Sequence, residues 1–98
     1  MKKIAILGIT GSIGTSAIEV IREHQDEFQI VLASSHQNSE KLFQLAEEFD
    51  ISQIVLTNEN LKISSNLENS KLYFGHHELQ QLLKSVDCDI VLNAISGS

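Results

Sequence analysis

The stretch "ILGITGSIGTSAIEVI", residues 6–21, decides the fold because three glycines join an apolar segment to a segment with helical spacing. Gly8, Gly11 and Gly14 recur every three residues, so the backbone there can adopt positive φ values and can be approached closely by a ligand. A short apolar run that ends at glycine is typical of a buried strand, which predicts a strand over residues 2–7. The glycines therefore form a strand-to-helix turn, and a phosphate is the first candidate to lie against them.

The other apolar segments alternate between strand-like and helix-like patterns. Strands are predicted at residues 28–34, 53–57, 71–74 and 89–95. The first helix runs from Ser12 to about His24, and its expected buried face holds Ile13, Ala17, Ile18 and Ile21. A second helix, with Ser39 as its N-cap, buries Leu42, Leu45, Ala46 and Phe49, and a third buries Leu79, Leu82, Leu83 and Val86. Residues 58–70 are polar and predict a loop with at most one short helix.

This alternation predicts an α/β fold, a Rossmann-like doubly wound parallel sheet with helices on both faces. Ser98 follows directly on the last predicted strand, where such a fold normally continues. We therefore expect residues 1–98 to be one incomplete nucleotide-binding domain of a longer protein.

Composition and charge narrow the classes of partner. The formal net charge of −6 disfavours nucleic acid and anionic membranes, which are bound mainly through Lys and Arg. No apolar stretch approaches the roughly 20 residues of a membrane span, and the N-terminus lacks the apolar core of a signal peptide. We expect a cytoplasmic protein, and the single Cys88 excludes a disulfide within the chain.

The glycine turn favours a dinucleotide. In a strand–helix–strand unit the pyrophosphate lies at the N-terminus of the first helix, where free N–H groups and the helix dipole attract negative charge. The spacing here is G-x-x-G-x-x-G, and Thr10 and Ser12 add hydroxyl groups. A tight turn without a ligand is the alternative, although it needs fewer glycines. A Walker P-loop is excluded because no Gly-Lys-[Ser/Thr] follows.

The segment after the second strand indicates which nucleotide is bound. An NAD site typically has an acid here for the ribose 2′-hydroxyl, but no acid occurs between Ala33 and Glu40. A 2′-phosphate would instead meet polar donors, with His36 and Lys41 nearby. These expected donors are Ser34, Ser35, Gln37 and Asn38. The segment therefore favours NADP over NAD, and an ordinary polar loop remains the alternative.

Three segments resemble the 1-deoxy-D-xylulose 5-phosphate reductoisomerase family. Thr10-Gly11-Ser12-Ile13-Gly14 matches the end of the family's G-S-T-G-S-I-G, with Ile9 in place of the serine. Asn38 matches the last residue of A-G-[K/R]-N, and "DIVLNAISG", residues 89–97, is similar to D-I-V-V-N-A-I-V-G. His36-Gln37 replaces Gly-Lys/Arg, which removes a cation from the 2′-phosphate side.

The resemblance implies an NADPH-dependent enzyme of isoprenoid biosynthesis. Such enzymes rearrange 1-deoxy-D-xylulose 5-phosphate with Mg²⁺ or Mn²⁺ and reduce the aldehyde intermediate to 2-C-methyl-D-erythritol 4-phosphate, and a homodimer is expected for the whole protein. By the family's motif, the pyrophosphate would be held by Thr10, Gly11, Ser12 and Ile13. The adenosine-phosphate end would meet His36, Gln37 and Asn38, and the nicotinamide would lie near Ala94, Ile95 and Gly97. The family's metal ligands and catalytic residues belong to a later domain, so none is expected here.

Two other functions remain open on the sequence alone. The chain could belong to another NAD(P)-dependent reductase or dehydrogenase, or to a non-enzymatic nucleotide-sensing module. His76-His77 suggests a metal pair at first sight, but adjacent residues on a helix do not share a face. A helix start is the better interpretation of these two histidines.

Overall fold

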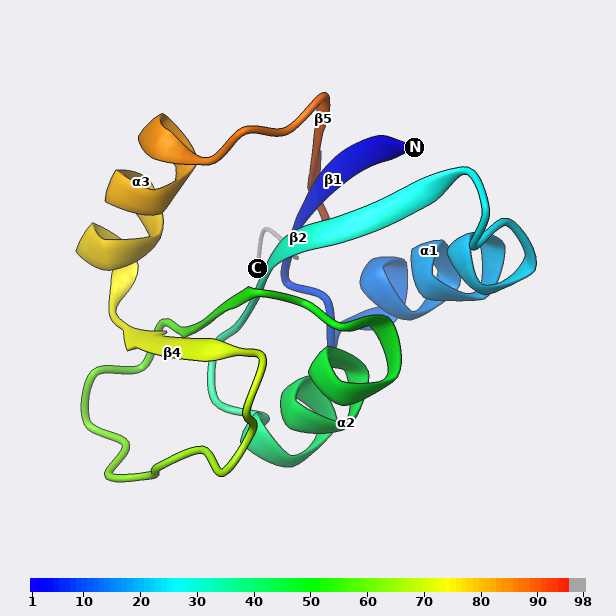
Figure 1. Ribbon diagram of the computed structural model, residues 1–98. Coiled ribbons are helices and arrows are strands. Elements are labelled where there is room, and N and C mark those ends of the chain that lie inside the picture. The colour runs from blue at the N-terminus through cyan, green and yellow to red at the C-terminus, as the bar shows by residue number, and fades with distance from the viewer. Residues whose placement is uncertain (96–98) are drawn as a thin grey trace.

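The computed structural model describes residues 1–95, which form one parallel sheet and three helices (Figure 1). The elements, in chain order, are β1 (Lys2–Leu7), α1 (Ser12–Glu23), β2 (Phe28–Ser35), α2 (Ser39–Phe49), β3 (Gln53–Leu56), β4 (Lys71–Phe74), α3 (His76–Ser85) and β5 (Ile90–Asn93). The strand order is β4-β3-β2-β1-β5, and every neighbouring pair is parallel.

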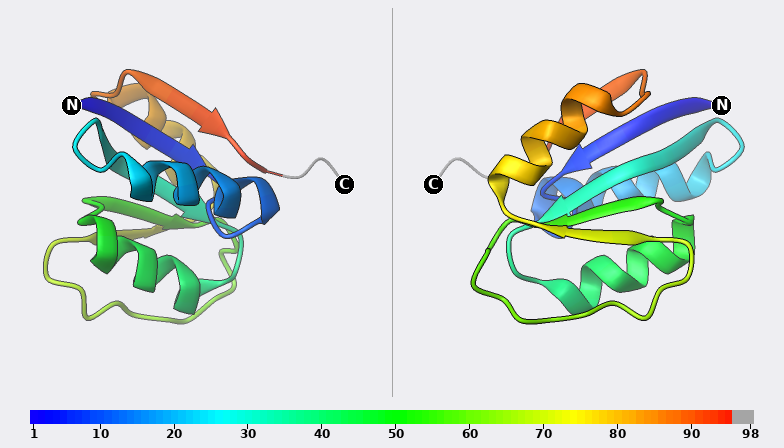
Figure 2. Two further views of the ribbon diagram at one scale, coloured as in Figure 1. Left: turned by 90° about the vertical axis from the view of Figure 1, so that its right-hand side faces the viewer. Right: turned by 60° about the vertical axis from the view of Figure 1, so that its left-hand side comes forward.

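Helices cover both faces of the sheet, which confirms the predicted fold class (Figure 2). The α1 and α2 helices pack on one face with Ile4 and Ile6 of β1. The α3 helix packs on the other face with Ala5 and Leu7. Successive residues of a strand point to opposite faces, so a strand covered on both sides must be apolar throughout. This requirement explains the unbroken apolar run before the glycine turn.

The buried face of α1 differs from the prediction at its first turn. Ile13 was expected to be buried, but it is 56% exposed. The buried residues are Gly14, Ile18 and Ile21. A Cβ on Gly14 would overlap the carbonyl oxygens of Gly8 and Ile9, so the helix lies directly on the preceding turn at this position. The spacing of Ile13 matched the helical pattern, but glycine occupies the contact.

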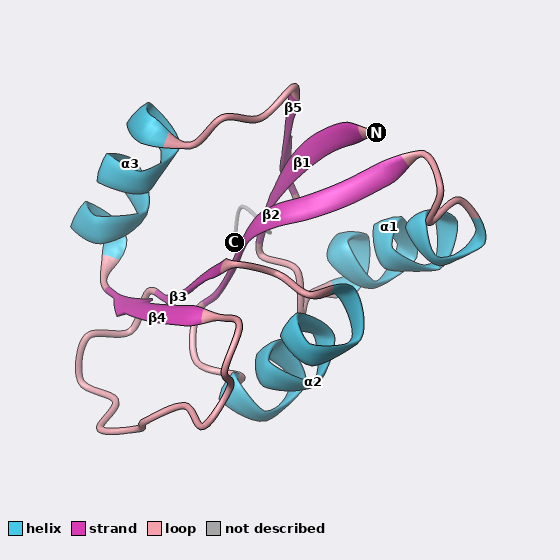
Figure 3. Ribbon diagram, viewed as in Figure 1, coloured by secondary structure: helices cyan, strands magenta, loops and turns pink. Residues whose placement is uncertain are grey.

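Several element ends also differ from the prediction. The N-cap of α2 is Asn38 rather than Ser39, and the Asn38 side chain accepts a hydrogen bond from the Lys41 N–H at 3.3 Å. The β2 strand extends one residue further than expected, to Ser35, whereas β3 stops at Leu56. The last strand is shorter than expected, since β5 covers only Ile90–Asn93. The loop predicted at residues 58–70 is confirmed; it begins at residue 57 and contains no helix (Figure 3).

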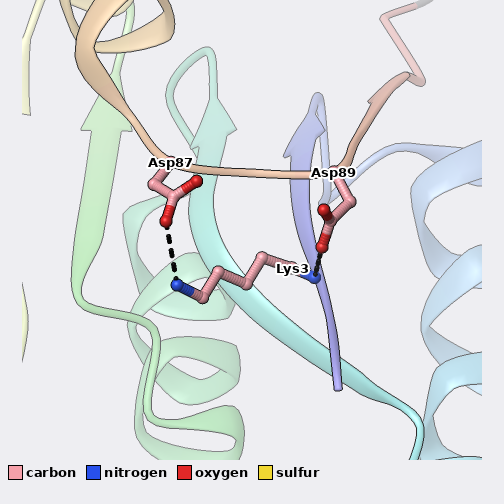
Figure 4. Close-up of polar contacts among 3 residues, drawn as sticks. All are labelled: Lys3, Asp87 and Asp89. Carbon is pink, nitrogen blue, oxygen red and sulfur yellow. Dashed lines mark hydrogen bonds and ion pairs between the residues drawn. The ribbon is translucent and has the colours of Figure 1, made fainter.

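The amino end of the sheet is held by polar contacts to Lys3 of β1 (Figure 4). The Lys3 backbone N–H donates to Asp89 Oδ2 at 2.9 Å, and Lys3 Nζ lies 3.1 Å from Asp87 Oδ2. These contacts align the start of β5 with β1 at the end opposite to the glycine turn.

Within residues 1–95, none of the helices has the length and apolar character of a membrane-spanning segment.

The direction in which successive strands are added to the sheet changes at β1. It leaves β1 toward β2, β3 and β4 on one side and returns through α3 to β5 on the other. In open α/β sheets, ligands bind outside the carboxyl ends of the strands at such a point. The glycine turn follows β1 directly and therefore lies at this position.

Candidate functional site

A cavity of about 380 Å³ opens at the carboxyl ends of the strands around β1. Its wall is built from the glycine turn, the end of β2, the segments after β3 and β5, and the first residue of α3. The lining residues are Gly8, Thr10, Gly11, Ser34, Ser35, His36, Thr57, His76, Ala94 and Ile95. Segments distant in the sequence thus meet at one site, as the topology requires.

The glycines of the turn serve different purposes. Gly8 has a φ of 75°, and a Cβ there would lie 3.0 Å from the backbone of Ile95. Gly8 and Gly14 are therefore required by the protein itself. Gly11 has a φ of −81° and a ψ of −177°, an extended conformation open to any residue. A Cβ on Gly11 would meet only ordinary contacts, at 3.5 Å from the Gly8 oxygen and 3.8 Å from the Ala94 oxygen.

The N-terminus of α1 is suited to an anion. In the part of the chain that the structure describes, no side chain caps this helix, and its first turn holds no acidic residue. The first N–H groups of a helix have no partner within the helix and carry partial positive charge. The nearby Lys41 Nζ donates to Thr15 Oγ1 at 2.9 Å, which places a cation beside the first turn of α1. An anionic group at this end of the cavity would thus meet N–H donors and the positive end of the helix dipole, whereas Lys41 lines a separate hollow with Ile9 and Thr15.

Ser34 and Ser35 hold the glycine turn in place. Both are buried, at 1% and 2% exposure. Ser34 Oγ accepts from the Gly8 N–H at 3.1 Å, and Ser35 Oγ shares a 2.7 Å hydrogen bond with Thr10 Oγ1. Both serines also line the cavity, and their expected role as donors to a 2′-phosphate stays a prediction, since a hydroxyl that accepts a hydrogen bond can still donate one. Their position at the end of a buried strand was the signal for their role in holding the turn.

Exposed residues follow β2 and form the rim of the site. His36 Nδ1 lies 3.1 Å from Thr57 Oγ1, and Gln37 Oε1 accepts from Asn58 Nδ2 at 3.4 Å. The Asn38 side chain is used as the N-cap of α2. Of the seven predicted cofactor-binding residues, the cavity is lined by Thr10, Gly11 and His36. The other four are exposed and do not line the cavity; they are Ser12, Ile13, Gln37 and Asn38.

The cavity also contains residues that sequence reasoning missed. Thr57 follows β3, and His76 begins α3, which confirms the helix-start interpretation of that histidine. Their local sequence does not mark either of them as a cavity residue, because only the parallel sheet brings them to the same cavity as His36. Ala94 and Ile95 line the cavity, and Gly97 lies outside the described residues; the expected place of these residues near the nicotinamide stays a prediction. Within residues 1–95, no three His, Cys, Asp or Glu side chains gather in a way that could hold a metal ion.

Comparison with known proteins is consistent with this geometry. The family model described as 1-deoxy-D-xylulose 5-phosphate reductoisomerase matches residues 4–98. The reductoisomerase of Clostridium kluyveri is 40% identical over 103 residues, which cover 99% of this chain and 27% of that protein. The reductoisomerase of Listeria welshimeri is 36% identical over 100 residues, covering 100% of this chain and 26% of that protein. The chain thus spans about a quarter of the length of these relatives.

A solved structure shows the same arrangement of elements. It is described as DOX-P reductoisomerase in complex with NADPH, fosmidomycin and magnesium. It superposes with a TM-score of 0.86 and 29% sequence identity, over 97% of this chain and 24% of that chain.

Proposed function

Because the chain belongs to the 1-deoxy-D-xylulose 5-phosphate reductoisomerase family, we propose that it is the NADPH-binding part of such an enzyme. The family match favours this function over another NAD(P)-dependent reductase or a nucleotide sensor. A relative that is 29% identical was solved with NADPH, which supports the choice of nucleotide.

Gly11 is the observation that carries the proposal. Neither its backbone conformation nor its neighbours require glycine, and its open side belongs to the cavity. A glycine that the protein does not need is explained by a ligand that approaches the backbone closely. The uncapped first turn of α1 supplies N–H groups and a favourable dipole for the pyrophosphate of NADPH.

The expected residue roles follow from this placement. Thr10, Gly11, Ser12 and Ile13 would hold the pyrophosphate at the start of α1. The adenosine-phosphate end would lie along the segment after β2, at His36, Gln37 and Asn38. The nicotinamide would lie toward the segment after β5, near Ala94, Ile95 and Gly97. The shared cavity supports Thr10, Gly11, His36, Ala94 and Ile95 in these roles.

The reaction of the whole protein is part of the proposal. It would convert 1-deoxy-D-xylulose 5-phosphate, a phosphorylated ketose, into 2-C-methyl-D-erythritol 4-phosphate with NADPH and Mg²⁺ or Mn²⁺. The described residues do not fit a metal ion, so we assign the metal and the catalytic residues to other parts of the protein. The homodimer and the cytoplasmic location are proposed from the family resemblance alone.

Replacing Gly11 by valine tests the nucleotide site. We expect Gly11→Val to weaken NADPH binding at least ten-fold, because the side chain fills the space of the pyrophosphate, whose charge-assisted hydrogen bonds contribute roughly 1.5–3 kcal/mol each. Nucleotide fluorescence gives the dissociation constant, and circular dichroism reports whether the domain stays folded.

Ser16→Val is the matched control, since it adds the same side chain to the exposed side of α1. We expect it to leave NADPH binding unchanged. Equal binding by the Gly11→Val variant and the wild type would refute the pyrophosphate site.

A further inference from the structure

His36 lines the cavity from the segment after β2, at a position where the family pattern has glycine. Thr57 contacts this histidine. Its Oγ1 lies 3.1 Å from His36 Nδ1, while the threonine itself is only 7% exposed. The histidine stands at the glycine position of the family's A-G-[K/R]-N. Thr57 therefore contacts an imidazole side chain that the family pattern, with glycine at this position, does not have.

The backbone fixes this contact. The Thr57 N–H donates to the Ser35 oxygen and the Asn58 N–H donates to the His36 oxygen, both at 2.9 Å. These bonds continue the pairing of β2 and β3 beyond the last residues of the strands. The positions of Thr57 and His36 are consequently set by the sheet, in contrast to residues on a free loop.

The Thr57 hydroxyl can either donate to His36 Nδ1 or accept from it, because a hydroxyl is both donor and acceptor. A neutral imidazole has one N–H donor and one acceptor nitrogen, and the partner of one nitrogen selects the tautomer. A threonine hydroxyl that donates to Nδ1 leaves the proton on Nε2, on the opposite side of the ring. A hydroxyl can also accept from Nδ1–H, so the contact is compatible with an Nε2–H in the neutral tautomer to which Thr57 donates and in the doubly protonated ring.

We propose that Thr57 sets the preference for NADPH over NADH by holding His36 with its Nε2–H ready to donate to the 2′-phosphate. This role rests on the proposed function, and Thr57 acts as a positioning residue through His36. The hydrogen bond from His36, held by Thr57, replaces part of the contact to the 2′-phosphate that Lys or Arg makes in the family pattern.

Dissociation constants of NADPH and NADH for the 98-residue chain, measured at fixed salt, test the role of Thr57. We expect Thr57→Val to weaken NADPH binding about three- to ten-fold, the range for one net hydrogen bond, and to leave NADH binding unchanged. Thr57→Ser keeps the hydroxyl and is expected to retain the wild-type ratio of the two constants. In a His36→Ala background, Thr57→Val should have no further effect, because the group it positions is gone.

The alternative outcomes separate the two proposals. Equal losses for NADPH and NADH in Thr57→Val, an unrescued ratio in Thr57→Ser, or additive effects with His36→Ala would each overturn the role of Thr57 while leaving the nucleotide site standing. A wild-type chain that binds neither nucleotide would overturn the proposed function and this inference with it.

Discussion

Gln37 is the residue at which the chain departs most from the charge pattern of its family. A primary amide donates neutral hydrogen bonds, whereas Lys or Arg at this position adds a positive charge toward a phosphate. Gln37 is exposed, and its Oε1 accepts from Asn58 Nδ2, which leaves the Gln37 amide hydrogens free to donate. We therefore expect that binding of a 2′-phosphate here would depend on neutral groups and on His36.

We predict that the wild-type chain binds NADPH only about ten-fold more tightly than NADH, a difference of roughly 1.4 kcal/mol. Gln37→Lys should widen this gap by about ten-fold or more, because a charge-assisted hydrogen bond contributes roughly 1.5–3 kcal/mol. Dissociation constants of both nucleotides at fixed salt measure the effect.

Gln29→Lys is the control for net charge, since Gln29 is an exposed residue near the opposite end of β2. It should leave the ratio unchanged. A wild type that prefers NADH, or a Gln37→Lys variant with an unchanged ratio, would mean that Gln37 does not face the ribose.

Single residues also show where sequence reasoning reaches its limit. The even spacing of Gly8, Gly11 and Gly14 correctly located the turn, but it could not say which glycine serves the backbone and which serves a ligand. That distinction depends on the distance from an added Cβ to neighbouring atoms. Similarly, Ser34 and Ser35 were located correctly at the end of β2, but their partners lie on another segment of the chain.

At the scale of elements, the sequence identified the helices and strands well because their apolar residues recur with the required periods. The errors lie at the ends. The sequence predicts Ser39 as the cap of α2, but Asn38, an equally good cap residue, precedes it, and only the hydrogen bond to Lys41 decides between them. Thr57 and His76 were missed as site residues because sheet topology alone brings them to the cavity.

An ion pair joins α1 to α2 on the face of the sheet that they share. Arg22 Nε and Nη2 donate to the two carboxylate oxygens of Glu48, at 2.7 and 2.9 Å. The guanidinium also lies 5.6 Å from the ring centroid of Phe49. Hydrogen bonds from Arg22 hold the pKa of the Glu48 carboxyl below its ordinary value of 4.5.

We predict that this contact makes a small, pH-dependent contribution to stability. Because the folded-state pKa of Glu48 is lowered, the contribution is complete above the ordinary value of 4.5 and disappears as the pH falls through the folded-state pKa. Glu48→Gln should therefore melt slightly below the wild type at neutral pH, and the two melting temperatures should converge in strong acid. The difference stays small because both side chains are largely solvated.

Thermal melts of wild type and Glu48→Gln across this pH range measure the effect. Glu47→Gln removes an exposed neighbouring carboxylate and serves as the control. A wild-type advantage that persists unchanged in strong acid would show that the pair does not act through ionised Glu48.

At the scale of the whole molecule, the cavity lies at one end of the sheet and the Lys3 contacts lie at the other. The described residues thus place the proposed nucleotide-binding surface at one end of a parallel sheet. The described residues contain no group of side chains suited to a metal ion. The chain also covers only about a quarter of the length of each relative. Nucleotide binding and the chemical step should accordingly be separable.

We predict that the 98-residue chain binds NADPH but does not consume it when 1-deoxy-D-xylulose 5-phosphate and Mg²⁺ or Mn²⁺ are added. In the proposed reaction a metal ion would polarise the oxygens of the substrate, and no cluster of ligands for such an ion lies within residues 1–95. NADPH absorbance followed with and without substrate measures turnover, and a nucleotide titration in the same buffer confirms that the cofactor site is filled. Substrate-dependent loss of NADPH would show that the catalytic groups lie within this chain, whereas binding without turnover would assign them to the rest of the protein.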